Sequence, residues 1–164
     1  MTIVARLLPV TLMCGLAACS APNPAVQTKF NQEASLPGGL PANPMQGKVI
    51  TSWVDHKNAT MSTLYGNDVA VHSARSNSQR QYPAGSMLSL VTWRQQEDPR
   101  WFGARPPATP VSVEFLTVDA AARNLSYKYE SYAGDPWKRT STEEGPTPGQ
   151  RAAFLLAQQA AVMP

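Results

Sequence analysis

The chain has 164 residues, enough for one domain with its own core, and a formal net charge of +3 at pH 7. Its lysines and arginines are scattered along the sequence, which excludes the clustered basic face that nucleic-acid binding requires. Charged residues make up 15% of the chain, against about 25% in an average soluble domain.

The N-terminus has the layout of a bacterial lipoprotein export signal. Arg6 is followed by an apolar stretch from Leu7 to Ala18, which is too short to span a bilayer comfortably, since a spanning helix needs roughly 20 residues. The stretch ends in Leu16-Ala17-Ala18-Cys19, which matches the lipobox. We predict a signal peptide over residues 1–18 and Cys19 as the acylated N-terminus of the mature protein. The alternative is an ordinary cleaved signal with a chance cysteine.

This prediction also determines location and thiol chemistry. Ser20 after the cysteine resembles lipoproteins sorted to the outer membrane, so we expect a lipid-anchored envelope protein that faces the periplasm. Cys14 lies in the removed segment and Cys19 carries lipid, and the sequence has no other cysteine. The mature domain therefore has no free thiol, disulfide or thiolate metal site.

Residues 19–47 are rich in proline, glycine, asparagine and glutamine, and they show no sustained apolar period. This composition predicts an extended, poorly ordered tether that lifts the domain off the membrane. Because a tether buries little surface, removal of residues 22–44 is expected to leave thermal stability nearly unchanged. The folded domain is predicted to span residues 48–164.

The folded part begins with an apolar, partly β-branched run over residues 49–54, which the sequence does not assign to a strand or a helix. Residues 61–65 predict a short strand that ends at Gly66. Asn67 can cap a helix over residues 68–75. Val69, His72 and Ala74 then lie on or near one helix face, and we expect His72 to face the sheet.

The second half of the chain holds the clearest strand patterns, over residues 86–94, 111–118 and 126–132. The first of these is apolar on both sides, which predicts a central strand covered on both faces. It follows a predicted turn over residues 82–85 with Pro83 at the first central position. Thr147 is expected to cap a final helix, with Pro148 in its first turn, that runs to about residue 161.

The loops between these strands hold no helix long enough for a crossover, so the strands are expected to be antiparallel. We therefore predict an α+β fold, an antiparallel sheet with flanking helices. The polar loop over residues 95–110 carries Trp101-Phe102-Gly103 at its tip. This tip is either packed back on the sheet or presented to a partner.

The sequence contains no recognisable catalytic constellation. His56 and His72 lack acidic neighbours at metal-ligand spacing, so no metal site is predicted. His56 is expected at the surface, whereas His72 is either a packed helix residue or a ligand to a bound cofactor. Glu114 lies alone between Val113 and Phe115, as an exposed strand carboxylate or, in the alternative, as an acid in a pocket.

Several motifs occur in an order that resembles a known family. Thr63–Ala70 contains a Gly-Asn helix start, and Tyr82–Leu88 contains a Pro-x-Gly turn that leads into a long strand. With the run from Trp93 to Phe115 and the ending Gln159–Pro164, this order resembles a lipoprotein branch of the cytochrome P460 family. The similarity covers roughly residues 53–164.

The resemblance implies a protein that is located in the periplasm, has a β-rich fold and forms a homodimer. Characterised members of the family hold a c-type haem through a Cys-x-x-Cys-His motif near the C-terminus, and they oxidise hydroxylamine or bind nitric oxide and similar gases. In this chain the region from Pro136 to Pro164 has neither cysteine nor histidine. The haem-attachment residues therefore do not carry over.

Three functions remain open at this point. The first is a haem-free, lipid-anchored module that binds a small ligand or a partner. The second is a protein that binds haem noncovalently, with His72 as the best available axial ligand, and that binds or oxidises small nitrogen compounds. The third is a surface protein that binds its partner through the Trp101-Phe102 loop.

Overall fold

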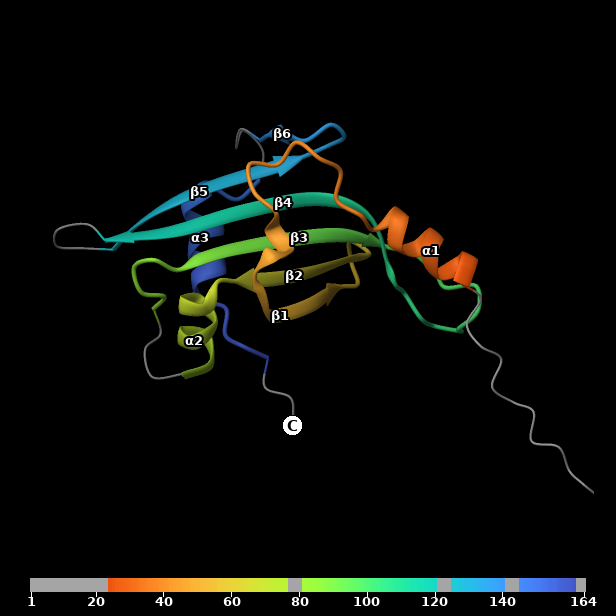
Figure 1. Ribbon diagram of the computed structural model, residues 1–164, viewed down its shortest axis with the longest axis horizontal. Helices are drawn as coiled ribbons and strands as arrows, with labels where there is room; N and C mark the ends of the chain where they lie inside the picture. Colours follow the sequence, from red (N-terminus) through yellow and green to blue (C-terminus); the bar gives the residue numbers. More distant parts are fainter. Residues whose placement is uncertain (1–23, 77–80, 121–124, 141–144, 162–164) are drawn as a thin grey trace, which may run out of the picture.

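An antiparallel sheet organises the computed structural model, which describes residues 24–76, 81–120, 125–140 and 145–161. Its six strands pair in sequence order: β1 (Lys48–Asp55), β2 (Thr60–Gly66), β3 (Met87–Gln95), β4 (Pro107–Ala120), β5 (Leu125–Ala133) and β6 (Lys138–Arg139). The helices are α1 (Pro24–Glu33), the short 3-10 helix η1 (Pro44–Gln46), α2 (Asp68–Ser76) and α3 (Pro148–Leu156) (Figure 1). This arrangement confirms the predicted α+β fold.

Strand β3 is central and buried on both faces, as its sequence predicts. It pairs with β2 on one side and with β4 on the other. Leu88 and Leu90 point into one hydrophobic cluster, whereas Val91 and Trp93 belong to a second. The sheet therefore has two covered faces, and each is covered by a different part of the chain.

Helices α2 and α3 cover the first face. Asn67 caps α2, because its side-chain Oδ1 accepts a hydrogen bond from the backbone N–H of Ala70 at 3.0 Å. Thr147 and Gln150 form a reciprocal capping box at the start of α3, which confirms the predicted cap. Helix α3 ends at Leu156, earlier than expected, and a nonhelical stretch continues along the fold with Ala161 bonded to Ile50 O at 3.0 Å.

The predicted orientation of α2 is wrong. The buried residues of this helix are Ala70, Val71 and Ala74, whereas Val69 is 42% exposed and His72 is exposed. Successive helical residues are about 100° apart, so a small error in phase turns one side chain inward and another outward. His72 therefore does not face the sheet.

The N-terminal segment, defined here as residues 34–46, covers the second face. Ala34, Leu36 and Leu40 pack against the cluster that contains Trp93. The indole N–H of Trp93 donates to Ala34 O at 2.9 Å, and the indole N–H of Trp137 donates to Pro37 O at 3.1 Å. The expectation of an extended, poorly ordered tether is therefore wrong, because residues 24–33 form α1 and residues 34–46 pack on the sheet. These contacts lead us to expect that removal of the segment lowers stability.

One local prediction needs correction, and one open question is answered. The run over residues 49–54 is a strand. The turn before β3 is closed by a hydrogen bond from the N–H of Ser86 to Pro83 O at 3.1 Å. Pro83 is therefore the first residue of this four-residue turn, and not its first central residue as predicted. Gly85 occupies a central position with φ of 84°, where a side chain would be strained.

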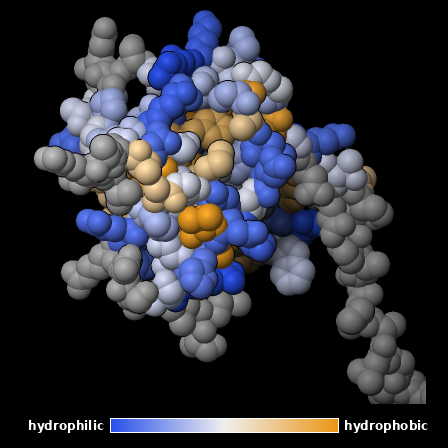
Figure 2. Space-filling model, turned by 60° about the vertical axis from the view of Figure 1, so that its left-hand side comes forward, coloured by the Kyte–Doolittle hydropathy of each residue, from blue (hydrophilic) through white to orange (hydrophobic). Residues whose placement is uncertain are grey.

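The expected signal peptide (residues 1–18) and the expected acylated residue Cys19 lie outside the described residues. Within the described ranges, no helix is long and apolar enough to cross a membrane. The surface seen in Figure 2 is mostly hydrophilic, with hydrophobic residues gathered in small separate areas.

Candidate functional site

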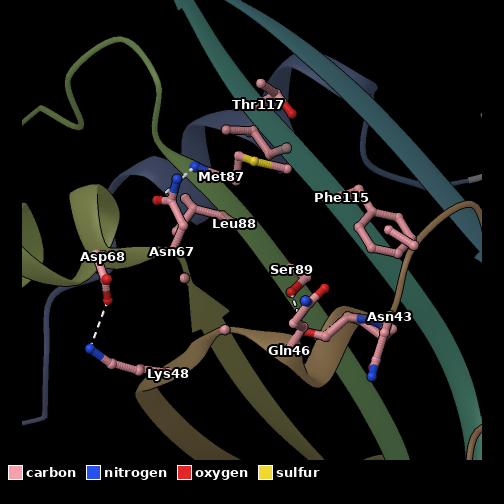
Figure 3. Close-up of a pocket in the computed structure, with 15 residues that line it drawn as sticks. Asn43, Gln46, Lys48, Asn67, Asp68, Met87, Leu88, Ser89, Phe115 and Thr117 are labelled. Carbon is pink, nitrogen blue, oxygen red and sulfur yellow. Dashed lines mark hydrogen bonds and ion pairs between the residues drawn. The ribbon is translucent and has the colours of Figure 1, made fainter.

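A groove with a volume of about 450 Å³ opens between η1 and the sheet, where β2, β3 and β4 lie side by side. Met87, Phe115 and Thr117 lie on its sheet side, and Asn43, Gln46 and Lys48 lie on the side of η1 (Figure 3). The Met87 side chain is 55% exposed although it lies at the start of a central strand. The groove thus offers an accessible apolar floor with polar residues at its rim.

Gly47 lets the wall of the groove approach β2 closely, and Gly66 packs against the core. A Cβ atom on Gly47 would lie 2.6 Å from the carbonyl oxygen of Gly66, and one on Gly66 would lie 2.6 Å from Ile50 Cδ1. The clash at Gly47 is with backbone atoms, which cannot move aside, so this position requires glycine, whereas the contact at Gly66 is with the end of the Ile50 side chain. At the start of η1, the Ser89 hydroxyl donates a hydrogen bond to Pro44 O. The groove is therefore held in shape by backbone contacts and by a side-chain hydrogen bond.

Asn67 connects the groove to α2 and to β3. Besides capping the helix, its Oδ1 accepts from the N–H of Met87 at 3.2 Å, and its Nδ2 donates to Gly85 O at 2.8 Å. Nearby, Lys48 and Asp68 form an ion pair at 2.7 Å across the rim, and the lysine lowers the pKa of Asp68. Both side chains are well exposed, so this pair contributes little to stability.

A buried ionic cluster lies on the other face of β4, where α3 covers the sheet. Glu114 is 5% exposed and accepts two hydrogen bonds from Arg151, at 2.6 and 3.0 Å, and a third from the Tyr129 hydroxyl at 2.6 Å. The expectation of an exposed carboxylate is therefore wrong, and the alternative of a buried acid in a hollow is correct. A hollow of about 440 Å³ borders the cluster.

The bonding of this cluster indicates a structural role. Three of the roughly four acceptor positions of the Glu114 carboxylate are taken by Arg151 and Tyr129, so this group is committed mainly to partners within the fold. Burial, together with the nearby Glu114, raises the pKa of Tyr129 to about 12. Burial on its own lowers the pKa of Arg151, but hydrogen bonds and charge interactions with Glu114 and Tyr129 together raise this pKa above its ordinary value. Both partners of Glu114 therefore keep their protons at neutral pH.

The histidines singled out from the sequence do not meet at a site. His56 lies in the turn between β1 and β2 and is exposed, and His72 is exposed on α2. Neither residue lines the groove or the hollow beside Glu114. In the part of the chain that the structure describes, no group of three or more His, Cys, Asp or Glu side chains could hold a metal ion.

The groove itself was not predicted from the sequence, because its wall comes from the segment expected to be a tether. Met87 gave the one available signal, as a large apolar residue at the exposed start of a strong strand pattern.

Among known proteins, the family model described as Cytochrome P460 matches residues 44–148, which is more than half of the chain. No curated protein matches the chain.

Proposed function

The chain belongs to the cytochrome P460 family, and we propose that it is a lipid-anchored envelope protein that binds a small, largely apolar ligand in the groove, without a covalently attached haem. The observation that carries the proposal is the exposure of Met87 on the floor of a groove whose walls are fixed. Methionine is flexible and polarizable, and it adapts to ligands of irregular shape.

The residues of this chain do not fit the c-type haem that the family implies. The sequence contains no Cys-x-x-Cys-His motif, so the covalent attachment and its proximal histidine are both missing. For a noncovalent haem, His72 would have to project into a cavity, but it is exposed on α2 and lines neither hollow. This geometry favours the haem-free proposal over the haem-binding alternative.

The composition of the groove supports an apolar ligand with one or two polar groups. Met87 and Phe115 offer apolar surface, and the ring of Phe115 is held edge-on against Tyr132, with ring centroids 6.0 Å apart. Asn43 and Gln46 at the rim have amide groups that can donate and accept hydrogen bonds. This combination is typical of small-molecule sites, which are mostly apolar with a few orienting polar groups.

The groove is tested by titrating the protein with the fluorescent probe 1-anilinonaphthalene-8-sulfonate. Met87→Glu should weaken probe binding roughly tenfold, equal to about 1.4 kcal/mol, because a carboxylate replaces apolar floor and repels the sulfonate. The matched control is Val54→Glu, which places the same charge on an exposed apolar position of β1 outside the groove. Probe affinity in this control should stay within twofold of the wild type.

Equal losses in both variants would show that the probe does not use the groove. The haem-free part of the proposal is tested separately, by the visible absorption spectrum of protein produced with haem supplied. A Soret band that disappears in His72→Ala would contradict this part.

The lipid anchor has its own test. Cys19→Ala should abolish acylation and release the protein from the membrane fraction. Each acyl methylene buried in the bilayer contributes about 0.8 kcal/mol to the free energy of membrane binding, and this variant loses that contribution. Cys14→Ala is the control, and it should be processed and retained normally. Mass spectrometry of the mature N-terminus and fractionation of cell envelopes give the result. Continued membrane retention of Cys19→Ala would count against the anchor.

A further inference from the structure

The loop between β3 and β4 presents two aromatic side chains to solvent. Trp101 is 68% exposed and Phe102 is 111% exposed, so neither packs back on the sheet. We propose that this pair, here called the aromatic tip, inserts into the surface of the phospholipid bilayer to which the chain is anchored. This inference rests on the proposed lipid anchor.

The aromatic tip is held in a defined conformation. The backbone N–H of Asp98 donates to Ala104 O at 3.0 Å, and the N–H of Ala104 donates to Trp101 O at 3.0 Å. Arg100 donates two hydrogen bonds to the Asp98 carboxylate, at 2.9 and 3.0 Å. Gly103, with φ of 79°, completes the turn. A rigid turn lowers the entropy lost when the aromatic side chains become ordered in a bilayer.

The tip lies at the same end of the molecule as the start of the described chain. Helix α1 and the loop between β3 and β4 lie together at one end of the long axis (Figure 1). Side-chain contacts join them: the Arg100 guanidinium lies 5.3 Å from the centroid of the Phe30 ring, and Gln96 Nε2 donates to Glu33 at 3.2 Å. The tip is thus attached to the helix that leads toward Cys19.

The length of chain before this helix places the tip within reach of the membrane. Five residue steps separate Cys19 from Pro24, and an extended chain spans at most about 3.6 Å per residue, or about 18 Å here. From Pro24 to Phe30, α1 rises about 9 Å at 1.5 Å per residue. The acyl chains on Cys19 would therefore hold the contact between Phe30 and Arg100 within about 30 Å of the bilayer.

The chemistry of the tip fits a lipid surface. Tryptophan is enriched where membranes meet water, because its ring is apolar and its indole N–H can still bond to water or headgroups. Lys29 on α1 and Arg105 in the loop are exposed and suit the phosphates of the lipids. Arg105 is joined only loosely to Glu97, at 3.9 Å, so its charge remains available.

The test uses the acylated protein purified from membranes and reconstituted into vesicles of phosphatidylethanolamine and phosphatidylglycerol. Part of the lipid carries bromine on its acyl chains, because bromine quenches tryptophan fluorescence on contact. We expect bromine quenching of the wild type and at least a twofold smaller quenched fraction in Trp101→Phe. Phe102→Ser should also reduce quenching, since insertion then loses one aromatic ring.

The matched control is Trp137→Phe, because the indole N–H of Trp137 is bonded to Pro37 O on the fold. Quenching should persist in this control. Equal quenching in the wild type and Trp101→Phe, or no quenching while the protein stays on the vesicles, would overturn the proposal. Cross-linking of the tip to an envelope protein in intact cells, together with no bromine quenching on the vesicles, would overturn it in favour of a protein partner. Mass spectrometry of the same sample reports acylation, so a failed anchor is recognised separately.

Discussion

Removal of residues 22–41 is expected to lower the free energy of unfolding by about 4 kcal/mol, because it uncovers part of the core. Val91 and Val113 are fully buried and Trp93 is 6% exposed beneath this segment. Each large apolar side chain brought into water costs about 1.5–3 kcal/mol, and the indole N–H of Trp93 also loses its bond to Ala34 O. Urea denaturation followed by circular dichroism measures the change.

The full-length version of this experiment replaces Leu36 and Leu40 with alanine, which keeps the chain but removes its apolar contacts. We expect about half of the loss caused by the deletion. Met45→Ala is the control, because Met45 is 42% exposed, and its effect should remain within about 0.5 kcal/mol. An unchanged urea midpoint after deletion would mean that the segment does not stabilise the sheet in solution.

Arg151→Ala is expected to cost about 3 kcal/mol, because it leaves the Glu114 carboxylate buried without its counter-ion. The Glu114 side chain is 7% exposed and that of Arg151 is 28% exposed, so solvent screens the pair weakly. The arginine also lies 4.9 Å from the centroid of the Phe154 ring, a contact that the substitution removes as well. Chemical denaturation at neutral pH measures the loss.

Two further variants show whether the cost comes from the unpaired charge. The double substitution Glu114→Leu with Arg151→Met should recover most of the lost stability, because apolar residues of similar size can replace a buried ion pair. Arg139→Ala should cost less than about 1 kcal/mol, since its side chain is 62% exposed in its pair with Glu130. A double variant as unstable as Arg151→Ala would show that packing, and not charge, causes the loss.

The parts of the fold that follow from local sequence were predictable. Strand β3 shows its two buried faces in its own residues, and Asn67 and Thr147 cap helices through bonds to residues only three positions away. The sheet class followed from short connections between strands. These features depend on the secondary-structure propensity of each residue and on residues a few positions away, and both can be read directly from the sequence.

The features that sequence reasoning missed depend on partners far along the chain. Glu114 is buried because Arg151 lies opposite it on α3, and no local pattern shows that pairing. The N-terminal segment has the composition of a tether, yet its backbone carbonyls accept bonds from the indoles of Trp93 and Trp137. The groove beside it was missed for the same reason. The homodimer implied by the family resemblance stays a prediction.

The sequential strand order has a consequence for the route by which the chain folds. Each strand pairs with its neighbour in the sequence, so the sheet can grow one hairpin at a time through short loop closures. Residues 34–46 precede β3 in the chain, and their hydrogen bonds with Ser89 and Trp93 span 45 and 59 positions. The N-terminal segment has no surface on which to dock until β3 and β4 have paired, so we expect it to complete the hydrophobic core late in folding.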